Sequence, residues 1–165
     1  MKLFLLSVLF ITSTVSIASY NRFGNHFYTI EAKHSGQCLN VINYSQENGG
    51  NVVQGTACDT SNFQWEFEAL PNGYYLIRAR HSGQCLNVIN FSQENGANVV
   101  QGTACDTTNF QWSLRRQGNG SYKLVARHSG QCLNVFNFSQ ENGANVVQGA
   151  ACDTTNFEWY IKRVN

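Results

Sequence analysis

The sequence has 165 residues, which is enough for one domain and hardly enough for two. Only 13% of the residues are charged, about half of the usual ~25%, while 42% are hydrophobic. The near balance of 11 basic and 10 acidic residues excludes the strongly basic surface typical of nucleic-acid-binding proteins. The apolar and aromatic content excludes a disordered chain. Polarity comes instead from amides, with 20 Asn and 12 Gln.

The first 18 residues have the pattern of a secretory signal peptide. Met1 and Lys2 give a positive start, residues 3–11 are apolar apart from one serine, and Ser16 and Ala18 fit cleavage after Ala18. The apolar run is too short to span a bilayer, which takes ~20 residues. A buried N-terminal helix is the alternative. We expect a secreted, extracellular protein that begins at residue 19, carries 10 residues of each charge sign and is not inserted in a membrane.

The rest of the sequence repeats one unit three times. An octapeptide, His-Ser-Gly-Gln-Cys-Leu-Asn-Val, recurs at intervals of 47 residues, beginning at His34, His81 and His128. Residues 81–112 and 128–159 differ at three of 32 positions. Three copies indicate a closed arrangement, because an open solenoid usually continues and ends in atypical caps. We expect repeats at about 27–70, 71–117 and 118–165.

Within each unit the pattern is that of short strands rather than helices. In the second unit we expect strands at residues 74–80, 85–89, 98–101 and 111–115. The segments between them are rich in Gly, Asn and Ser, as turns and loops are. Four strands in each of three units predict an all-β, barrel-like domain of twelve strands. No helix of useful length is expected.

The six cysteines follow the repeat. Six cysteines allow 15 pairings, but only pairing within each unit respects the repeat with a short loop. The expected disulfides, each closing a separation of 20 residues, are Cys38–Cys58, Cys85–Cys105 and Cys132–Cys152. Each should contribute about 3 kcal/mol. Zinc binding is the rival interpretation, but the sequence has no Cys-x-x-Cys spacing.

These features together resemble a known family. Cys38-Leu39-Asn40-Val41, Gln54 four residues before Cys58, and Asn62-Phe63-Gln64-Trp65 are similar to the repeat of ricin-B-type lectins. The resemblance runs from about Phe27 to Val164 and recurs in register three times. It implies a β-trefoil with three four-stranded units around a pseudo-threefold axis, a core tryptophan in each unit and one shallow sugar pocket per unit. The usual Gln of the family's Gln-x-Trp motif is replaced by Phe63, Phe110 and Phe157.

The resemblance also implies which residues would hold a sugar. The family's acidic residue after the first cysteine is matched by Asn40, Asn87 and Asn134. Its third-strand glutamine is matched by Gln54, Gln101 and Gln148. Its asparagine three residues before the tryptophan is matched by Asn62, Asn109 and Asn156. The family's stacking aromatic is replaced by Thr56, Thr103 and Ala150. An asparagine lacks the charge-assisted hydrogen bond of an aspartate. We therefore do not expect a standard galactose site.

Two further features leave alternatives open. Tyr44, Phe91 and Phe138 follow the second strand of their units and are either replacement platforms for a sugar ring or rings packed on the barrel. The polar run around Asn95 either contacts a ligand or forms a solvated turn.

A comparison of the units with one another favours three equal sites. Residues 66–80 and 113–127 differ at 10 of 15 positions, in contrast to the near-identical blocks beside them. The matched blocks include loop amides, which we do not expect core packing to fix. Three equal binding sites would keep them alike, and local gene conversion is the competing explanation.

Four sequons predict N-glycosylation of a secreted chain, at Asn43, Asn90, Asn119 and Asn137. Three of them lie beside the expected pockets, which glycans there would crowd or block.

Catalysis is not expected. The repeated His34, His81 and His128 favour a structural role, because one asymmetric catalytic site would not need three copies. No phosphate-binding glycine loop or carboxylate cluster is evident, so we expect no metal and no other cofactor.

The sequence therefore predicts a secreted, multivalent lectin whose partners are glycans or glycoproteins and not nucleic acid. The alternative is a secreted β-trefoil that binds a protein or inhibits a protease through one exposed loop. Oligomeric state is not indicated by the sequence.

Overall fold

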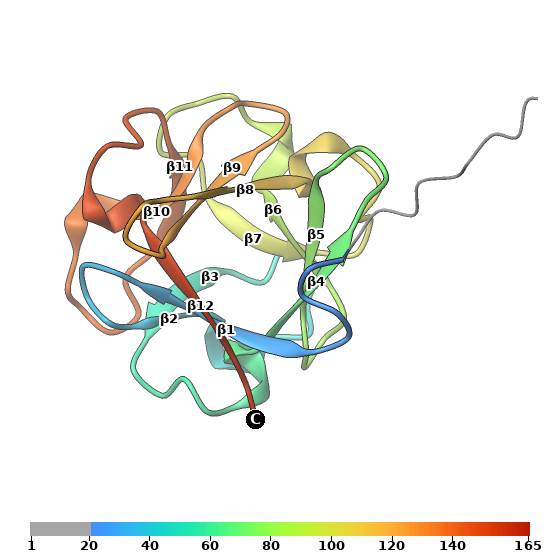
Figure 1. The fold of residues 1–165 in the computed structure, drawn as a ribbon, viewed down its shortest axis with the longest axis horizontal. Helices are drawn as coiled ribbons and strands as arrows, with labels where there is room; N and C mark the ends of the chain where they lie inside the picture. The colour runs from blue at the N-terminus through green and yellow to red at the C-terminus, as the bar shows by residue number, and fades with distance from the viewer. Residues whose placement is uncertain (1–20) are drawn as a thin grey trace, which may run out of the picture.

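The computed structural model describes residues 21–165; the expected signal peptide lies outside them. Residues 21–165 form twelve strands, four in each repeat. They are β1 (Phe27–Ala32), β2 (Cys38–Val41), β3 (Val52–Gly55), β4 (Trp65–Ala69), β5 (Tyr75–Ala79), β6 (Cys85–Val88), β7 (Val99–Gly102), β8 (Trp112–Arg116), β9 (Tyr122–Ala126), β10 (Cys132–Val135), β11 (Val146–Gly149) and β12 (Trp159–Arg163). Figure 1 shows the three repeats around a common centre, coloured blue to teal, green to yellow, and orange to red. The predicted β-trefoil is confirmed.

The only helical elements among the described residues are six single turns of 3-10 helix. They follow β2, β6 and β10 and precede β4, β8 and β12, at Ile42–Tyr44, Ile89–Phe91, Phe136–Phe138, Ser61–Phe63, Thr108–Phe110 and Thr155–Phe157. None of the helices in residues 21–165 is long and apolar enough to cross a membrane.

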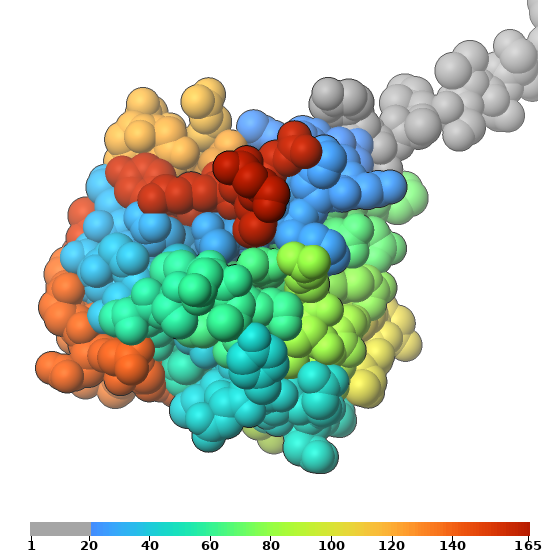
Figure 2. Space-filling model, turned by 90° about the horizontal axis from the view of Figure 1, so that it is seen from below, coloured from blue at the N-terminus to red at the C-terminus, as the bar shows by residue number. Residues whose placement is uncertain are grey.

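Six strands, which we call the barrel strands, close on themselves. Antiparallel pairing runs in the order β1, β4, β5, β8, β9, β12 and back to β1. The closure leaves the first and last strands side by side, with Ile30 opposite Ile161. Figure 2 shows the red end of the chain lying next to the blue segment of β1. A closed barrel has no edge strand that could pair with another molecule.

The other six strands form three hairpins, which we call the cap hairpins: β2–β3, β6–β7 and β10–β11. They meet one another through isolated bridges, one of which pairs Asn51 with Val100. A ring of three amides joins them. Asn51 Nδ2 donates to Asn145 Oδ1 at 3.0 Å, Asn98 Nδ2 donates to Asn51 Oδ1 at 2.8 Å, and Asn145 Nδ2 donates to Asn98 Oδ1 at 2.8 Å. Each repeat gives one bond and receives one.

The core lies between barrel and cap. Each repeat contributes a fully buried tryptophan, namely Trp65, Trp112 and Trp159. Each indole Nε1 donates to a backbone oxygen of the cap hairpin in its own repeat, as Trp65 does to Leu39 at 2.9 Å. The indole therefore ties barrel to cap and leaves no buried donor unpaired.

The predicted cysteine pairing is also confirmed. The three disulfides are Cys38–Cys58, Cys85–Cys105 and Cys132–Cys152, each with a sequence separation of 20. Each joins the start of a cap hairpin to the segment that leads back to the barrel.

Loop amides hold the repeats together, contrary to the expectation that packing would not fix them. The loops between the strands of the cap hairpins, which we call the linking loops, are residues 42–51, 89–98 and 136–145. Loop 42–51 docks on the second repeat through its own amide, since Gln46 Nε2 donates to the oxygen of His81 at 3.3 Å. In return, Gln84 Nε2 donates to the backbone oxygen of Gln46 at 2.6 Å. The same contact joins Gln131 to Gln93 and Gln37 to Gln140. Contacts between repeats thus require the loop amides, independently of any ligand.

Candidate functional site

Each repeat has one open pocket on the outer face of its cap hairpin. The first pocket lies on β2–β3, the second on β6–β7 and the third on β10–β11, with volumes of about 340, 460 and 520 Å³. None of the residues that line these pockets is charged. Such a surface suits a neutral, hydroxyl-rich ligand, because it offers hydrogen bonds without demanding a counter-charge.

The strand asparagine expected in each site forms part of the floor of its pocket, and in the first two pockets a second expected asparagine lies beside it. In the first pocket these are Asn40, at the centre of β2, and Asn62, in the 3-10 turn before β4. Asn40 Nδ2 donates to the oxygen of Val53 at 3.2 Å, and Asn62 Nδ2 donates to the oxygen of Val41 at 3.0 Å. Both side chains are buried, and their amides are held by backbone. The equivalent pair in the second pocket is Asn87 with Asn109. In the third repeat Asn134 lines the pocket, whereas Asn156 is buried next to Asn134 and is not part of the lining.

The expected glutamines point the other way. In the β2–β3 pairing Gln54 lies opposite Leu39, whereas Asn40 lies opposite Val53. Directly opposed residues share a face and successive residues alternate, so Gln54 and Asn40 project from different faces of the hairpin. The Gln54 side chain is completely buried, and only its strand position borders the pocket.

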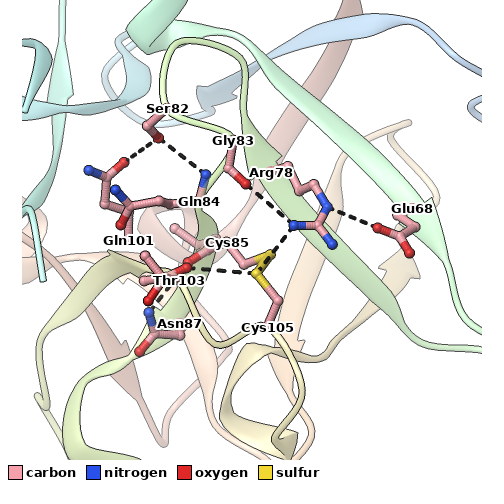
Figure 3. The surroundings of a disulfide bond; sticks show 12 residues. Glu68, Arg78, Ser82, Gly83, Gln84, Cys85, Asn87, Gln101, Thr103 and Cys105 are labelled. Atoms are coloured by element: carbon pink, nitrogen blue, oxygen red, sulfur yellow. Dashed lines mark hydrogen bonds and ion pairs between the residues drawn. A yellow bond between two sulfur atoms is a disulfide. The ribbon is translucent and has the colours of Figure 1, made fainter. Parts of the chain in front are cut away.

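Every polar atom of these glutamine amides is bonded within the protein. Gln101 Oε1 accepts from Ser82 at 2.7 Å, and Gln101 Nε2 donates to the oxygens of Ser45 and Glu47 at 2.8 and 3.0 Å. Figure 3 shows the Gln101 amide directed toward Ser82, away from Asn87. Gln54 and Gln148 make the same three contacts. These glutamines position the linking loop of another repeat, and their amides have no free donor or acceptor site directed at a ligand.

The linking loops complete the pockets, each on a repeat other than its own. Asn142 closes the first pocket, Asn48 the second and Asn95 the third. Each side-chain Oδ1 accepts from a backbone N–H on the opposite rim, from Thr56, Thr103 and Ala150 respectively, at 3.0–3.2 Å. The sequence left open whether the polar run around Asn95 contacts a ligand or forms a solvated turn. In the structure Asn95 both borders a pocket and joins two repeats.

The sequence did not lead us to expect that a glycine in the pocket floor lies close to the floor asparagine and to a phenylalanine ring. A side chain at Gly55 would place its Cβ 2.8 Å from Asn40 Nδ2 and 3.0 Å from the Phe63 ring. Gly102 and Gly149 are equally confined. The glycine after each Val-Val-Gln, and the phenylalanine in place of the family's glutamine, were the available signals. Together they let an aromatic ring lie against the floor asparagine.

The three expected aromatic platforms are half exposed. Tyr44, Phe91 and Phe138 have 47%, 47% and 46% of their surface accessible. Each ring contacts a histidine of another repeat edge-on, as Phe138 does with His34 at 4.9 Å between centroids. Of the three, only Phe91 borders a pocket. The rings therefore have partial packing on the barrel and partial access to solvent, between the two alternatives considered.

The histidines themselves join repeats. His81 Nε2 lies 2.9 Å from the oxygen of Ser45, and since a carbonyl only accepts, Nε2 carries the proton. His34 and His128 make the same contact with Ser139 and Ser92.

Three of the four sequon asparagines lie at pocket rims. Asn43, Asn90 and Asn137 are exposed, and each lines the pocket of its own repeat. Asn119 lies elsewhere, in the turn before β9, where its Nδ2 donates to Glu158 at 2.9 Å. A glycan on any of the first three would therefore stand at a pocket entrance.

Comparison with known proteins identifies the family that has this architecture. The family model described as ricin-type beta-trefoil lectin domain-like matches residues 21–102, 64–149 and 108–165. A search of curated proteins found no match.

Solved structures give the same fold. The chain is similar to the designed threefold symmetric protein ThreeFoil, with 43% identity and a TM-score of 0.82 over 84% of this chain and 99% of that one. It is similar to part of an exo-beta-1,3-galactanase from Clostridium thermocellum, with 31% identity and a TM-score of 0.81 over 84% of this chain but only 30% of the enzyme. A ricin B-like lectin from Macrolepiota procera, solved in complex with lactose, shares the fold at 15% identity, with a TM-score of 0.73 over 85% of this chain and 96% of that one.

Three pockets built on the three cap hairpins, a core tryptophan in each repeat and a family match across all the described residues lead to one conclusion. The chain belongs to the ricin-type beta-trefoil lectin domain-like family.

Proposed function

We propose that the protein is a secreted, multivalent lectin with one shallow sugar site in each repeat. The observation that carries this proposal is the recurrence of one neutral pocket with a strand asparagine in its floor and an asparagine from another repeat at its rim. The lactose complex of the Macrolepiota lectin supports carbohydrate as the ligand class.

The pocket chemistry suggests weak single sites. Amides donate to and accept from sugar hydroxyls, but these neutral bonds are about half as strong as charge-assisted ones. Dissociation constants of roughly millimolar to high micromolar would fit open pockets of this kind. Three sites on one rigid body would raise the avidity for a surface that displays many copies of a glycan, without new contacts.

Several features support secretion of the chain from residue 19 onward as one lectin domain. Three disulfides suit an oxidising compartment, and the first 18 residues have a signal-peptide pattern. Three exposed sequons fit the same route. Because these sequons border the pockets, we propose that the sugar-binding form is the one in which they carry no glycan.

We do not propose an enzymatic role. Glycosidases use a pair of carboxylates that flank the scissile bond. The residues lining the three pockets include no Asp or Glu. The galactanase similarity covers 30% of that enzyme and carries no activity to this chain.

A glycan array tests the proposal, with protein made in an oxidising bacterial compartment that adds no N-glycans. One variant blocks all three rims without removing an internal side-chain bond of the floor, by Thr56→Glu, Thr103→Glu and Ala150→Glu. A matched control places the same charges outside the pockets, by Asn25→Glu, Gln117→Glu and Asn165→Glu. A second variant removes the floor amides, by Asn40→Ala, Asn87→Ala and Asn134→Ala, with its fold checked by circular dichroism.

Binding that is lost in both pocket variants and retained in the control supports the proposed sites. Binding that persists in both keeps the lectin and moves its sites elsewhere on the surface. Silence of the folded, unglycosylated protein across the array overturns the proposal and favours a protein partner that contacts an exposed loop.

A further inference from the structure

The third pocket differs from the other two, although the repeats that build them are nearly identical. Residues 81–112 and 128–159 differ at Ile89/Phe136, Thr103/Ala150 and Gln111/Glu158. Phe136 and Ala150 both line the third pocket. Glu158 lies in a separate ion pair with Lys33. Two of the three differences are therefore concentrated in one pocket, and each makes its lining less polar or more aromatic.

The two positions lie at opposite ends of the same pocket floor. Val135 pairs with Val146 and Cys132 pairs with Gly149, so Phe136 and Ala150 lie just beyond opposite ends of the paired segment. Asn134 lies between them in β10. A ligand seated on Asn134 thus has the Phe136 ring at one end and a methyl group instead of a hydroxyl at the other.

Phe136 does not fill a gap in the core. It has 48% of its surface exposed, whereas Ile42 and Ile89 at the same position are partly buried. The ring does not close the third pocket, whose volume of about 520 Å³ is similar to the 460 Å³ of the second. An exposed aromatic ring beside an open polar pocket is a feature of binding sites rather than of packing.

The exchange at the other end removes a hydroxyl that, in the second pocket, also binds the rim asparagine. In the second pocket Asn48 Oδ1 accepts from the backbone N–H of Thr103 at 3.1 Å and from its hydroxyl at 3.5 Å. In the third pocket Asn95 Oδ1 accepts only from the backbone N–H of Ala150, at 3.0 Å, as Asn142 Oδ1 in the first pocket accepts only from that of Thr56, at 3.2 Å. A carboxamide oxygen has two lone pairs, so Asn95 keeps one acceptor position for a ligand.

We infer that the third pocket is the principal site and takes a pyranose with a contiguous C–H face, which stacks on Phe136 while its hydroxyls contact Asn134 and Asn95. The inference rests on the proposed function and deepens it, because it assigns unequal roles to three pockets. The aromatic platform stands at the opposite end of the pocket from the position that Ala150 occupies. The first and second pockets have isoleucine in its place and act as weaker auxiliary sites, although the exposed Phe91 ring also borders the second.

Two exchanges between repeats test this, and each uses residues already present at the equivalent positions. Phe136→Ile with Ala150→Thr converts the third pocket to the second, and Ile89→Phe with Thr103→Ala does the reverse. The probe is lactose, whose galactose ring presents adjoining C–H bonds on one face. Side-chain amide signals of Asn40, Asn87 and Asn134 in nuclear magnetic resonance spectra of unglycosylated protein report each pocket separately.

In the unmodified protein we expect lactose to move the Asn134 signal at a concentration about threefold to tenfold lower than the other two. The first exchange should remove this advantage, and the second should bring Asn87 up to the affinity of Asn134. Equal titration of all three signals, or an advantage that survives the first exchange, overturns the inference and leaves the lectin proposal standing. No movement of any signal overturns the inference for galactose-type rings, and the array then decides the lectin proposal on its own.

Discussion

The barrel strands and the cap hairpins have diverged very differently across the repeats. Residues 66–80 and 113–127 form equivalent barrel segments and differ at 10 of 15 positions, whereas residues 81–112 and 128–159 differ at three of 32. In the barrel, the inward side chains pack on the core and stay apolar, as Phe67 and Leu114 do at equivalent positions. The outward residues, such as Glu68 and Arg115, meet solvent.

In the cap hairpins and linking loops, most of the side-chain amides form hydrogen bonds within the protein. The amide of Gln101 bonds three groups, the Asn51 side chain joins the ring at the centre, and Asn48 bridges two rims. Apart from the bond between Gln101 and Ser82, which lies within one repeat, these contacts cross from one repeat to another, and each exists three times. Near identity of these segments therefore follows from assembly of the trefoil, and equal ligand sites are not required to explain it.

The largest effect should come from breaking one of these contacts in the second repeat. Gln101→Ala removes one partner of the Glu47 backbone oxygen and the acceptor of the Ser82 hydroxyl. It also leaves the Ser45 oxygen with His81 alone. Each unpaired buried group costs about 1–3 kcal/mol. We expect a loss of about 3 kcal/mol in the free energy of unfolding, measured by denaturant titration with the disulfides intact. The same substitution in the barrel region, Gln117→Ala, should stay within about 0.5 kcal/mol. Equal losses in the two variants would remove the distinction between the regions.

A histidine at the junction of two repeats should matter less. His81→Ala removes the bond to Ser45 and the edge contact with Tyr44, and we expect a loss of about 1–2 kcal/mol. His26 is exposed, so His26→Ala is the matched control and should be nearly neutral. Thermal unfolding followed by circular dichroism compares the two variants, and a destabilised His26 variant would contradict the assignment.

The junction between the third and first repeats adds a charge pair, and its contribution should depend on pH. Hydrogen bonds from Lys33, Asn119 and Ser121 lower the pKa of Glu158 from 4.5 to about 2. Because the folded-state pKa is depressed, the stabilisation is fully present above pH 4.5 and is lost as the pH falls toward 2. Glu158→Gln should cost about 1 kcal/mol at pH 7, after allowance for solvent screening.

Denaturant titrations of Glu158→Gln and the unmodified protein at several pH values provide the check. The two stabilities should converge near pH 2, where Glu158 itself becomes protonated. A difference that stays constant from pH 7 to pH 2 would show that the ion pair is not its cause.

The smallest effect belongs to the outward face of the barrel. Arg78 donates to Glu68 at 2.9 Å between exposed side chains, and it also contacts Gly83 and Cys105 (Figure 3). Glu68→Gln should cost about 0.5 kcal/mol or less and nothing measurable at high salt, because exposed pairs are screened. A salt-independent loss above about 1 kcal/mol would place the barrel surface under the same constraints as the cap.

Much of the fold follows from the sequence because the repeat supplies each observation three times. The 47-residue interval, the cysteine spacing and the alternating apolar residues lead to twelve strands, three disulfides and core tryptophans. The direction of Gln54 also lay within reach, since Val-Val-Gln-Gly in a strand puts Gln and the preceding residue on opposite faces. The resemblance to lectins led instead to a role for Gln54 in the pocket.

The remaining parts of the site depend on contacts between repeats, which no pattern within one repeat reveals. Asn142 reaches the first pocket only because loop 136–145 docks on the first repeat, 86 residues away from Thr56. The importance of Phe136 likewise depends on its exposure. In a sequence, a change from Ile to Phe is equally compatible with a ring that fills the core and with a ring exposed at a pocket. Only the surface of the folded chain shows which of these Phe136 is.

The pairing of β1 with β12 has a consequence for where the chain could be cut. The backbone N–H of Val164 donates to Phe27 at 2.8 Å, so the two ends of the barrel already lie together. The turns at Asn72-Gly73 and Asn119-Gly120 occupy the equivalent junctions between the other repeats. A short linker across the present ends and a new opening at either turn would give a circular permutant with the same ring of contacts. In that sense the order of the three repeats along the polypeptide is interchangeable, while their cyclic order in space is fixed.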